Sequence, residues 1–288
     1  MSSSTLVPHL LRGAALSPFK RPRADASLPD RRVVVPGLRV DRRRLAAYAA
    51  VCGFDAPDAA GAALPVTYPH VLGFPSTMRL MSGWDFPLPV LGLVHTAIEI
   101  RQLRELRTDA EYELTVHAAE LTPHRRGTEA RIVTRVRTAG ETVWESDSSY
   151  LARHATRSPG SPDAAADTGG GTDGAARALP VRAEWRLGGD LGRRYGAASG
   201  DRNPIHLYPL TARLFGFPRA IVHGMWSVGR CLAEYGVQGP VEVTAAFRKP
   251  VLLPGTVHYA AEGPAFALRG GPDGERVHLT GEVRPLAE

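Results

Sequence analysis

Cysteine is scarce in this sequence. Its 288 residues include two, Cys52 and Cys231, which lie far apart in the chain. So distant a pair is not the dense disulfide framework of a small secreted domain. We therefore expect two buried, reduced thiols and a cytoplasmic protein.

Long apolar runs are also missing. No hydrophobic stretch approaches the ~20 residues that a membrane-spanning helix requires. The first twenty residues contain several leucines and alanines, but Pro8, His9 and Arg12 interrupt them. We therefore expect neither a membrane span nor a secretory signal segment.

Lysine is almost absent, although the chain carries a net charge of +6 and a pI ≈ 9.7. The positive charge comes from arginine, because Lys20 and Lys249 are the two lysines. These arginines are mostly scattered, and we find no zinc-finger spacing, aromatic RNA-binding motif or recognition-helix pattern. We expect no nucleic-acid partner. An anionic ligand such as coenzyme A, or an acidic carrier protein, suits the same charge.

The length predicts two domains, and 43% hydrophobic residues are enough for ordinary buried cores. Residues 1–30 are polar and rich in proline and arginine, which is typical of a flexible N-terminal arm. Residues 153–179 consist mainly of Ala, Gly, Ser, Thr, Asp and Pro, with hardly a large apolar side chain. They predict a flexible linker between domains at 31–152 and 180–288.

Each predicted domain combines a central helix with several antiparallel strands. The first shows a strand, a helix capped by Asp41, a central helix and four further strands, at 33–40, 41–53, 71–82, 95–103, 111–118, 129–137 and 142–151. Period-2 alternation is clear at 111–118 and 129–137. The second shows a short strand, a central helix and three strands, at 183–187, 221–235, 241–248, 256–262 and 276–283. The two patterns form a coarse internal repeat.

The segment 199–206, S-G-D-R-N-P-I-H, holds the most informative chemistry. It brings a carboxylate, an amide and an imidazole within six residues, at Asp201, Asn203 and His206. The serine, glycine and proline around them favour turns, which predicts a loop rather than a helix.

An apolar stripe at helical spacing follows this loop, with His223, Gly224 and Met225 in its first turns. The start of a helix offers unpaired N–H donors and the positive end of a dipole. Acid and base groups that face such a helix start suit enolate chemistry beside a carbonyl.

The ordered pattern S-G-D-x-N-P-I-H, then G-F, then I-x-H-G-M resembles the active-site signature of MaoC-type (R)-specific enoyl-thioester hydratases and 3-hydroxyacyl-thioester dehydratases. It occupies residues 199–206, 216–217 and 221–225. The resemblance implies an α+β double hot-dog fold, in which two antiparallel sheets each wrap a central helix to form a pseudo-dimer. It also implies that the N-terminal half has lost the catalytic loop and shapes the acyl pocket.

The resemblance implies reversible hydration of trans-2-enoyl thioesters, which reverses the dehydration of (R)-3-hydroxyacyl thioesters, on coenzyme A or an acyl carrier protein. Asp201 and His206 would act on the reacting water or hydroxyl, and Asn203 would hold the loop and the water. The N–H of Gly224 would stabilise charge on the thioester oxygen. This chemistry requires neither a metal nor a redox cofactor.

Five further residues are candidates for substrate binding: Ser199, Gly200, His223, Met225 and Arg248. A structural role at the helix start is the alternative for His223, packing is the alternative for Met225, and a solvated strand end is the alternative for Arg248.

Two histidines of the N-terminal half, His70 and His95, have no carboxylate at matching spacing. We expect structural or surface roles for them.

Two other functions fit the same features. A hot-dog acyl-thioesterase would use the carboxylate to activate water at the thioester carbonyl, and a non-catalytic subunit would bind acyl thioesters without turnover. A double hot dog supplies in one chain the pair that single hot dogs form by dimerising, so a monomer and a homodimer are both compatible with the sequence. Acyl length, carrier and direction stay open.

Overall fold

The structure, a computed structural model, describes residues 17, 20, 22, 24–57, 59–155 and 169–286. Most of the predicted N-terminal arm lies outside the described residues. So does the part of the predicted linker between residues 156 and 168.

Within its described residues, the first half contains two helices and five strands. They are β1 (Val33–Arg39), α2 (Arg42–Cys52), α3 (Tyr68–Met81), β2 (Val94–Gln102), β3 (Glu111–His124), β4 (Gly127–Thr138) and β5 (Glu141–Arg153). The carboxylate of Asp41 accepts hydrogen bonds from the first amides of α2, as predicted, and Gly53 ends that helix with φ 78°. The central helix α3 begins at Tyr68, three residues before the predicted start.

The second half repeats this plan with additional short helices. It contains α4 (Gly169–Ala178), β6 (Val181–Leu187), α5 (Leu191–Ser199), α6 (Pro204–Leu207), α7 (Pro209–Leu214), α8 (Gly224–Tyr235), β7 (Val241–Phe247), β8 (Gly255–Glu262), β9 (Ala265–Gly270) and β10 (Arg276–Pro285). The sequence pattern did not predict α5, α6, α7 and β9. The central helix begins at Gly224 rather than at Ile221, which instead forms an isolated bridge with Leu252.

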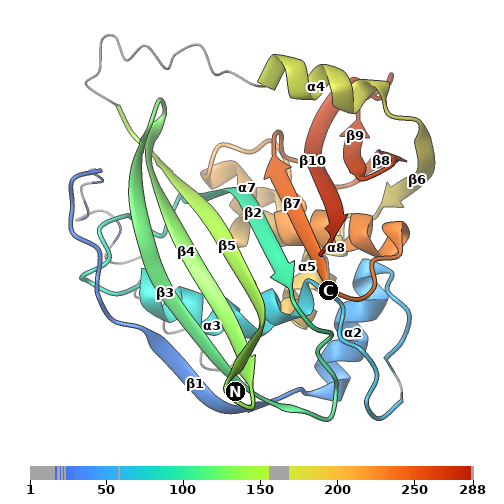
Figure 1. The fold of residues 1–288 in the computed structure, drawn as a ribbon. Coiled ribbons are helices and arrows are strands. Elements are labelled where there is room, and N and C mark those ends of the chain that lie inside the picture. The colour runs from blue at the N-terminus through green and yellow to red at the C-terminus, as the bar shows by residue number, and fades with distance from the viewer. Residues whose placement is uncertain are drawn as a thin grey trace.

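All ten strands belong to one antiparallel sheet in the order β1-β3-β4-β5-β2-β7-β10-β9-β8-β6 (Figure 1). The halves meet where β2 pairs with β7, with Ile98 opposite Ala245. The two predicted antiparallel sheets are thus joined edge to edge into one continuous sheet. β2 and β7 would each be an edge strand of their own half, and they pair with one another, which leaves β1 and β6 as the outer edges.

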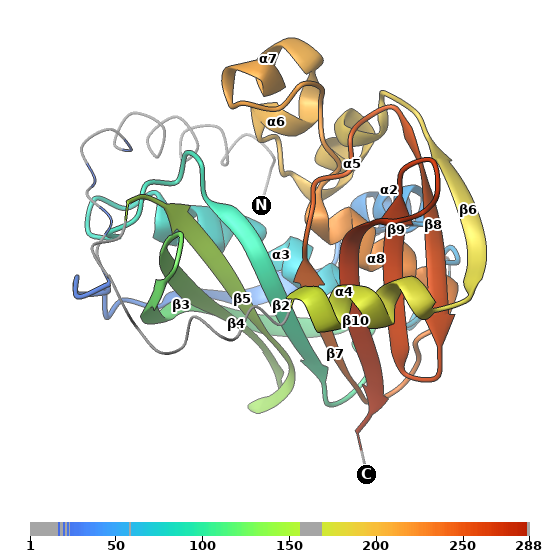
Figure 2. The ribbon, with the colours of Figure 1, turned by 90° about the horizontal axis from the view of Figure 1, so that it is seen from above.

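The sheet curves around α3 in the first half and around α8 in the second (Figure 2). Buried side chains of α8 lie on most of its circumference: Met225, Trp226, Val228, Cys231 and Leu232. One hydrophobic core extends through both halves. The indole of Trp226 donates to the carbonyl of Val51 at 2.8 Å and so links α8 to α2. This is the expected double hot-dog arrangement.

The end of the predicted linker forms a helix, which corrects the expectation of a flexible segment there. Helix α4 lies across the outer face of β9 and β10 (Figure 2). Ala176 packs against Ala267 and Val277, and the guanidinium of Arg269 donates to the carbonyl of Ala176. Small side chains allow this close contact, and their composition alone does not reveal it.

None of the helices in the described ranges is long and apolar enough to cross a membrane. Cys52 and Cys231 are both buried free thiols, as predicted.

Candidate active site

Asp201 lies in a short connection whose geometry is fixed by side-chain caps. Helix α5 continues to Ser199, and Pro204 begins the single turn α6, so the predicted loop is shorter than 199–206. The Asp201 carboxylate accepts from the amide of Asn203 at 3.1 Å. The Asn203 side chain in turn accepts from the amide of Ile205 at 3.4 Å. These local bonds hold the backbone and set the direction of the Asp201 side chain.

Ser199 and Gly200 support this connection. The Ser199 hydroxyl donates to the carbonyl of Tyr195 at 2.9 Å and accepts from the amide of Asp201 at 3.2 Å. Gly200 ends α5 with φ 87°, where a side chain would be strained. Ser199 borders the cavity described below, whereas Gly200 does not, so the structure gives Gly200 a backbone role rather than a substrate contact.

His206 is buried, and one of its ring nitrogens is already engaged. Its Nδ1 lies 2.8 Å from the carbonyl oxygen of Ile221, so Nδ1 carries the proton and Nε2 is left as an acceptor. Burial lowers the pKa of His206, and the nearby Asp201 carboxylate partly offsets that effect. At neutral pH the ring is therefore neutral and able to take a proton at Nε2.

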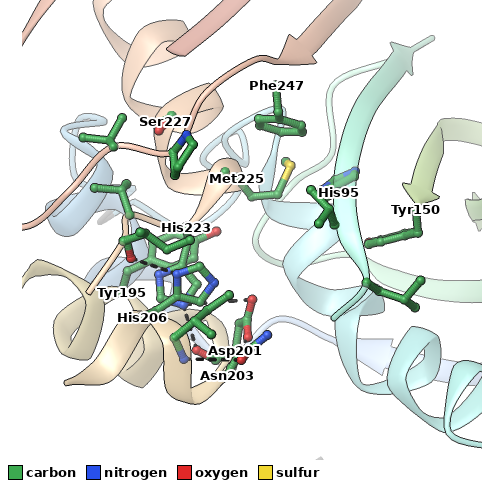
Figure 3. A pocket seen from close by; sticks show the side chains of 18 of the residues that line it. His95, Tyr150, Tyr195, Asp201, Asn203, His206, His223, Met225, Ser227 and Phe247 are labelled. Carbon is green, nitrogen blue, oxygen red and sulfur yellow. Dashed lines mark hydrogen bonds and ion pairs between the residues drawn. The ribbon is translucent and has the colours of Figure 1, made fainter. Parts of the chain in front are cut away.

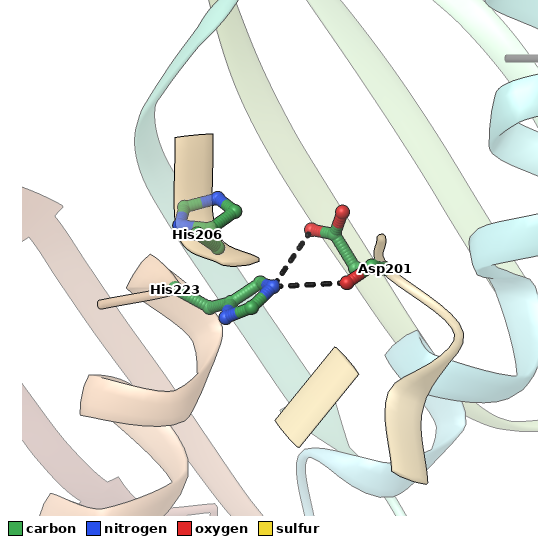
Figure 4. Close-up of side chains that lie close together, drawn as sticks. All are labelled: Asp201, His206 and His223. Atoms are coloured by element: carbon green, nitrogen blue, oxygen red, sulfur yellow. Dashed lines mark hydrogen bonds and ion pairs between the residues drawn. The ribbon is translucent and has the colours of Figure 1, made fainter. Parts of the chain in front are cut away.

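His223 lies directly against Asp201 and His206 (Figure 4). Its Nε2 donates to the backbone carbonyl of Asp201 at 3.0 Å, and its ring stacks on that of His206 with centroids 3.7 Å apart. Burial and the neighbouring His206 hold the pKa of His223 well below its ordinary value. The structural alternative for His223 therefore fits its contacts, because a neutral ring fixes the backbone of the Asp201 connection.

Asp201, His206 and His223 each bring a polar atom into a group whose members lie within 4.8 Å of one another. Burial raises the pKa of Asp201, while His206 and the amide of Asn203 lower it. A carboxyl with a raised pKa beside a neutral imidazole can give and take protons near neutral pH.

The same three groups are close enough to surround a cation. However, the Nε2 of His223 donates to a carbonyl and therefore has no lone pair for a metal, and its Nδ1 is buried without a partner. The remaining donors are His206 Nε2 and the Asp201 carboxylate, fewer than the three protein ligands of a typical catalytic zinc site. The arrangement favours proton transfer.

The first turn of α8 begins beside this centre. The carbonyl of His223 accepts from the amides of Trp226 and Ser227, which leaves the amides of Gly224 and Met225 without intrahelical acceptors. A Cβ on Gly224 would lie 2.7 Å from the ring of Phe247. Glycine is required there by the close approach of that ring, and it also leaves the amide open to a ligand.

A cavity of ≈ 260 Å³ connects this centre with the N-terminal half (Figure 3). The second half contributes all of the predicted site residues except Gly200: Ser199, Asp201, Asn203, His206, His223, Gly224, Met225 and Arg248. The first half contributes a mainly apolar wall: Val71, Phe74, Met78, Met81, Val90, Leu93 and Val94. The cavity therefore has a polar end and an apolar end.

The structure also shows cavity residues that the sequence did not indicate. His95 lies between Tyr150 and Phe247, with ring centroids 4.6 and 4.8 Å away, and His70 lies 5.9 Å from His95. Both histidines border the cavity rather than the outer surface. Period-2 alternation marks β2 and β5 as strands but does not show which face lines a cavity, so Tyr150 carried no readable signal.

Arg248 borders the cavity too, as expected of a substrate contact. Its Nε lies 3.8 Å from the carboxylate of Asp173 on α4. The guanidinium is therefore tied to the helix that replaced part of the predicted linker, and it is not a solvated strand end.

A double hot dog with one acid/base centre at the end of an apolar cavity is the architecture of an enzyme that acts on acyl thioesters. Residues 181–264 match the model of the MaoC like domain. Over 292 aligned positions the sequence is 37% identical to 3-hydroxyacyl-thioester dehydratase X of Mycobacterium tuberculosis, and the alignment covers 99% of this chain and 100% of the relative. The chain belongs to the MaoC-like dehydratase family.

Solved structures agree with this assignment. The crystal structure of HtdX of Mycobacterium tuberculosis superposes with a TM-score of 0.74 at 35% identity, covering 89% of this chain and 100% of the other. A MaoC-like dehydratase from Phytophthora capsici has a TM-score of 0.69 at 18% identity, covering 92% of this chain and 98% of the other. A Mycobacterium tuberculosis protein described as a double hotdog fold has a TM-score of 0.54 at 14% identity, with coverages of 91% and 98%, and these last two support the fold alone.

Proposed function

We propose that the chain interconverts (R)-3-hydroxyacyl thioesters and trans-2-enoyl thioesters. The observation that carries this proposal is the convergence of Asp201 and His206 beside the first amides of α8, at the polar end of a cavity with an apolar wall. The 37% identical relative is named for this dehydration. Hydration and dehydration follow one path in opposite directions, so the same residues serve both.

Hydration moves two protons around a single water. One proton leaves the water as its oxygen bonds to C3, and one proton arrives at C2, so the protein is unchanged after the cycle. The Nε2 of His206 would accept the proton that leaves the water, because Nδ1 already donates to the carbonyl of Ile221. Asp201 would take part in the same proton transfers, because burial raises the pKa of its carboxyl. Positioned acid and base groups contribute about 10²–10⁴-fold each.

The thioester oxygen gains negative charge while C2 is reacting. An N–H of the first turn of α8, that of Gly224, would donate to it, and one such donor contributes about 3–4 kcal/mol. Asn203 keeps the connection in place through its bond from Ile205. The acyl chain would extend along α3, over the side chains of Val71 and Phe74 that border the cavity.

One chain supplies all the groups of this site, so we propose that activity needs no second copy, whether the chain acts as a monomer or as a homodimer. Both coenzyme A and carrier-protein thioesters fit the chemistry. A cytoplasmic location stays a prediction.

The thioesterase alternative predicts different products. With crotonyl-CoA, a hydratase removes the enoyl absorbance and releases no free thiol, whereas a thioesterase releases thiol in proportion to turnover. We expect loss of absorbance without thiol, and the same rate after treatment with a chelator. Thiol release equal to substrate loss would contradict the proposal, and binding without turnover would favour a non-catalytic subunit.

A further inference from the structure

An exposed apolar patch lies on the short helix α7 and its ends. Tyr208, Leu210, Leu214 and Phe215 form it, and we call these four residues the α7 patch. Leu210 is 72% exposed and Leu214 is 79% exposed. Large aliphatic side chains this open, grouped on one short segment, mark an interaction surface more often than a solvated one. In Figure 2, α6 and α7 project from the body of the molecule.

The segment that carries the patch also contributes to the wall of the cavity. Ile205 on α6 and Phe217 just after α7 both line the cavity, while the α7 patch between them faces outward. A partner that binds the patch would therefore lie against the segment that covers the catalytic centre.

Positive charge surrounds the patch. Between residues 191 and 233 the acidic residue is Asp201 alone, against six arginines. Four of these, Arg193, Arg202, Arg213 and Arg219, are exposed and form no ion pair with a carboxylate in the part of the chain that the structure describes. Elsewhere on the surface arginines commonly pair with acids, for example in the ladder of Arg131, Glu120 and Asp147.

Contacts hold two of these arginines close to the patch. The guanidinium of Arg193 lies over the ring of Tyr208 at 5.4 Å and donates to the carbonyl of Leu207 at 3.2 Å. Arg213 is on α7 itself and donates to the carbonyl of Pro218 at 3.3 Å. The result is an apolar centre with a cationic rim, which is the usual anatomy of a protein interface.

We propose that the α7 patch and its arginine rim form the docking surface for an acidic acyl carrier protein that delivers the thioester. This inference rests on the proposed function and adds the macromolecular part of the substrate. Charge complementarity selects the occupant: a second copy related by twofold symmetry would place the same arginines against one another. An acidic carrier supplies the missing carboxylates, and its pantetheine arm would enter beside α6 and α7.

The test compares two substrates that share one reacting group. Crotonyl-CoA and the crotonyl thioester of a purified bacterial acyl carrier protein are assayed with the wild type and with Leu210→Glu/Leu214→Glu. Both positions are exposed, so the fold is expected to persist. We expect kcat/KM to fall about tenfold or more with the carrier and to stay within about twofold with crotonyl-CoA. Arg213→Gln, which removes charge from the rim alone, lowers the carrier value about threefold.

Val34→Glu is the matched control, because Val34 is an exposed apolar residue on the edge strand β1. It should leave kcat/KM unchanged with both substrates. If Leu210→Glu/Leu214→Glu lowers kcat/KM equally with both substrates, or with neither, the proposal is overturned.

Binding of the carrier protein without its prosthetic group, followed by fluorescence anisotropy, tests docking independently of catalysis. We expect binding that weakens in Leu210→Glu/Leu214→Glu. If the wild type fails to hydrate crotonyl-CoA, the proposed function fails while this measurement still decides docking. A wild-type dimer that the double variant dissociates would identify the patch as a contact between copies. Binding to anionic phospholipid vesicles in place of the carrier would equally refute the proposal.

Discussion

Replacing Asp201 with asparagine separates its role in proton transfer from its role in structure. The carboxylate accepts one hydrogen bond within the connection, from the amide of Asn203. An asparagine oxygen at the same position can accept that bond, so the loop geometry is expected to survive. What disappears is a group that can take and give a proton next to His206.

The expected loss follows from the value of one positioned acid or base. A decrease of about 10²–10⁴-fold in kcat corresponds to about 2.7–5.4 kcal/mol of transition-state stabilisation. Substrate binding should change much less, because asparagine has the same shape and still forms hydrogen bonds. KM is therefore expected to stay within a few fold of the wild type.

Stability should not follow activity. Burial raises the pKa of Asp201, so its favourable contribution to folding is present below the unfolded pKa and is lost as pH rises through the folded one. Burial penalises the ionised carboxylate, and asparagine removes that desolvation cost. The melting temperature of Asp201→Asn at pH 7 is therefore expected to equal or exceed that of the wild type.

The assay is the decrease in enoyl absorbance with crotonyl-CoA, combined with thermal unfolding at pH 7. Asp190→Asn is the matched control, because Asp190 precedes α5 without capping it by a side-chain bond and forms an exposed ion pair with Arg194. That variant should keep full activity. An Asp201→Asn enzyme with wild-type kcat would refute the assignment, and a loss of kcat that tracks a large drop in melting temperature would reduce Asp201 to a structural residue.

Two further predictions concern the cavity. Gly224→Ala places a Cβ 2.7 Å from Phe247 and should lower both the activity and, by about 1–3 kcal/mol, the stability. Adding Phe247→Leu to this variant should restore part of both, as measured by unfolding and by the rate of hydration. Burial lowers the pKa of His70 to about 4, so between pH 6.5 and 4 this ring binds a proton in the unfolded chain but not in the folded one. The free energy of unfolding is therefore expected to fall by up to about 3 kcal/mol over this range. His70→Leu should flatten this part of the urea-unfolding profile, and an unchanged acid slope would show that His70 does not cause it.

The clustering of acid, amide and imidazole groups could be predicted because these residues are close together in the sequence. Asp201, Asn203 and His206 fall within six residues, and turn-forming neighbours between them restrict how far apart they can lie. The stripe of α8 was equally readable, since a helix enclosed by a curved sheet must be apolar on most of its circumference. Asp41 and Gly53 marked the ends of α2 by ordinary capping rules.

Features that depend on contacts between distant segments could not be read in this way. Pairing of β2 with β7 is decided by which strands are left as edges, and no motif records it. Helix α4 is stabilised by its contact with β9 and β10 rather than by its own composition. The cavity positions of His70 and His95 required the fold, because each residue taken alone is an ordinary histidine of a buried or half-buried element.

The two halves also differ at the backbone, which explains why one centre is enough. Helix α3 occupies in the first half the place that α8 occupies in the second, but its second residue is Pro69, where α8 has Met225. Proline has no N–H, so α3 offers one donor fewer to a thioester oxygen. The first half therefore lacks both the acid/base side chains and part of the backbone donor set, and its Phe74 and Met78 instead give the cavity an apolar end.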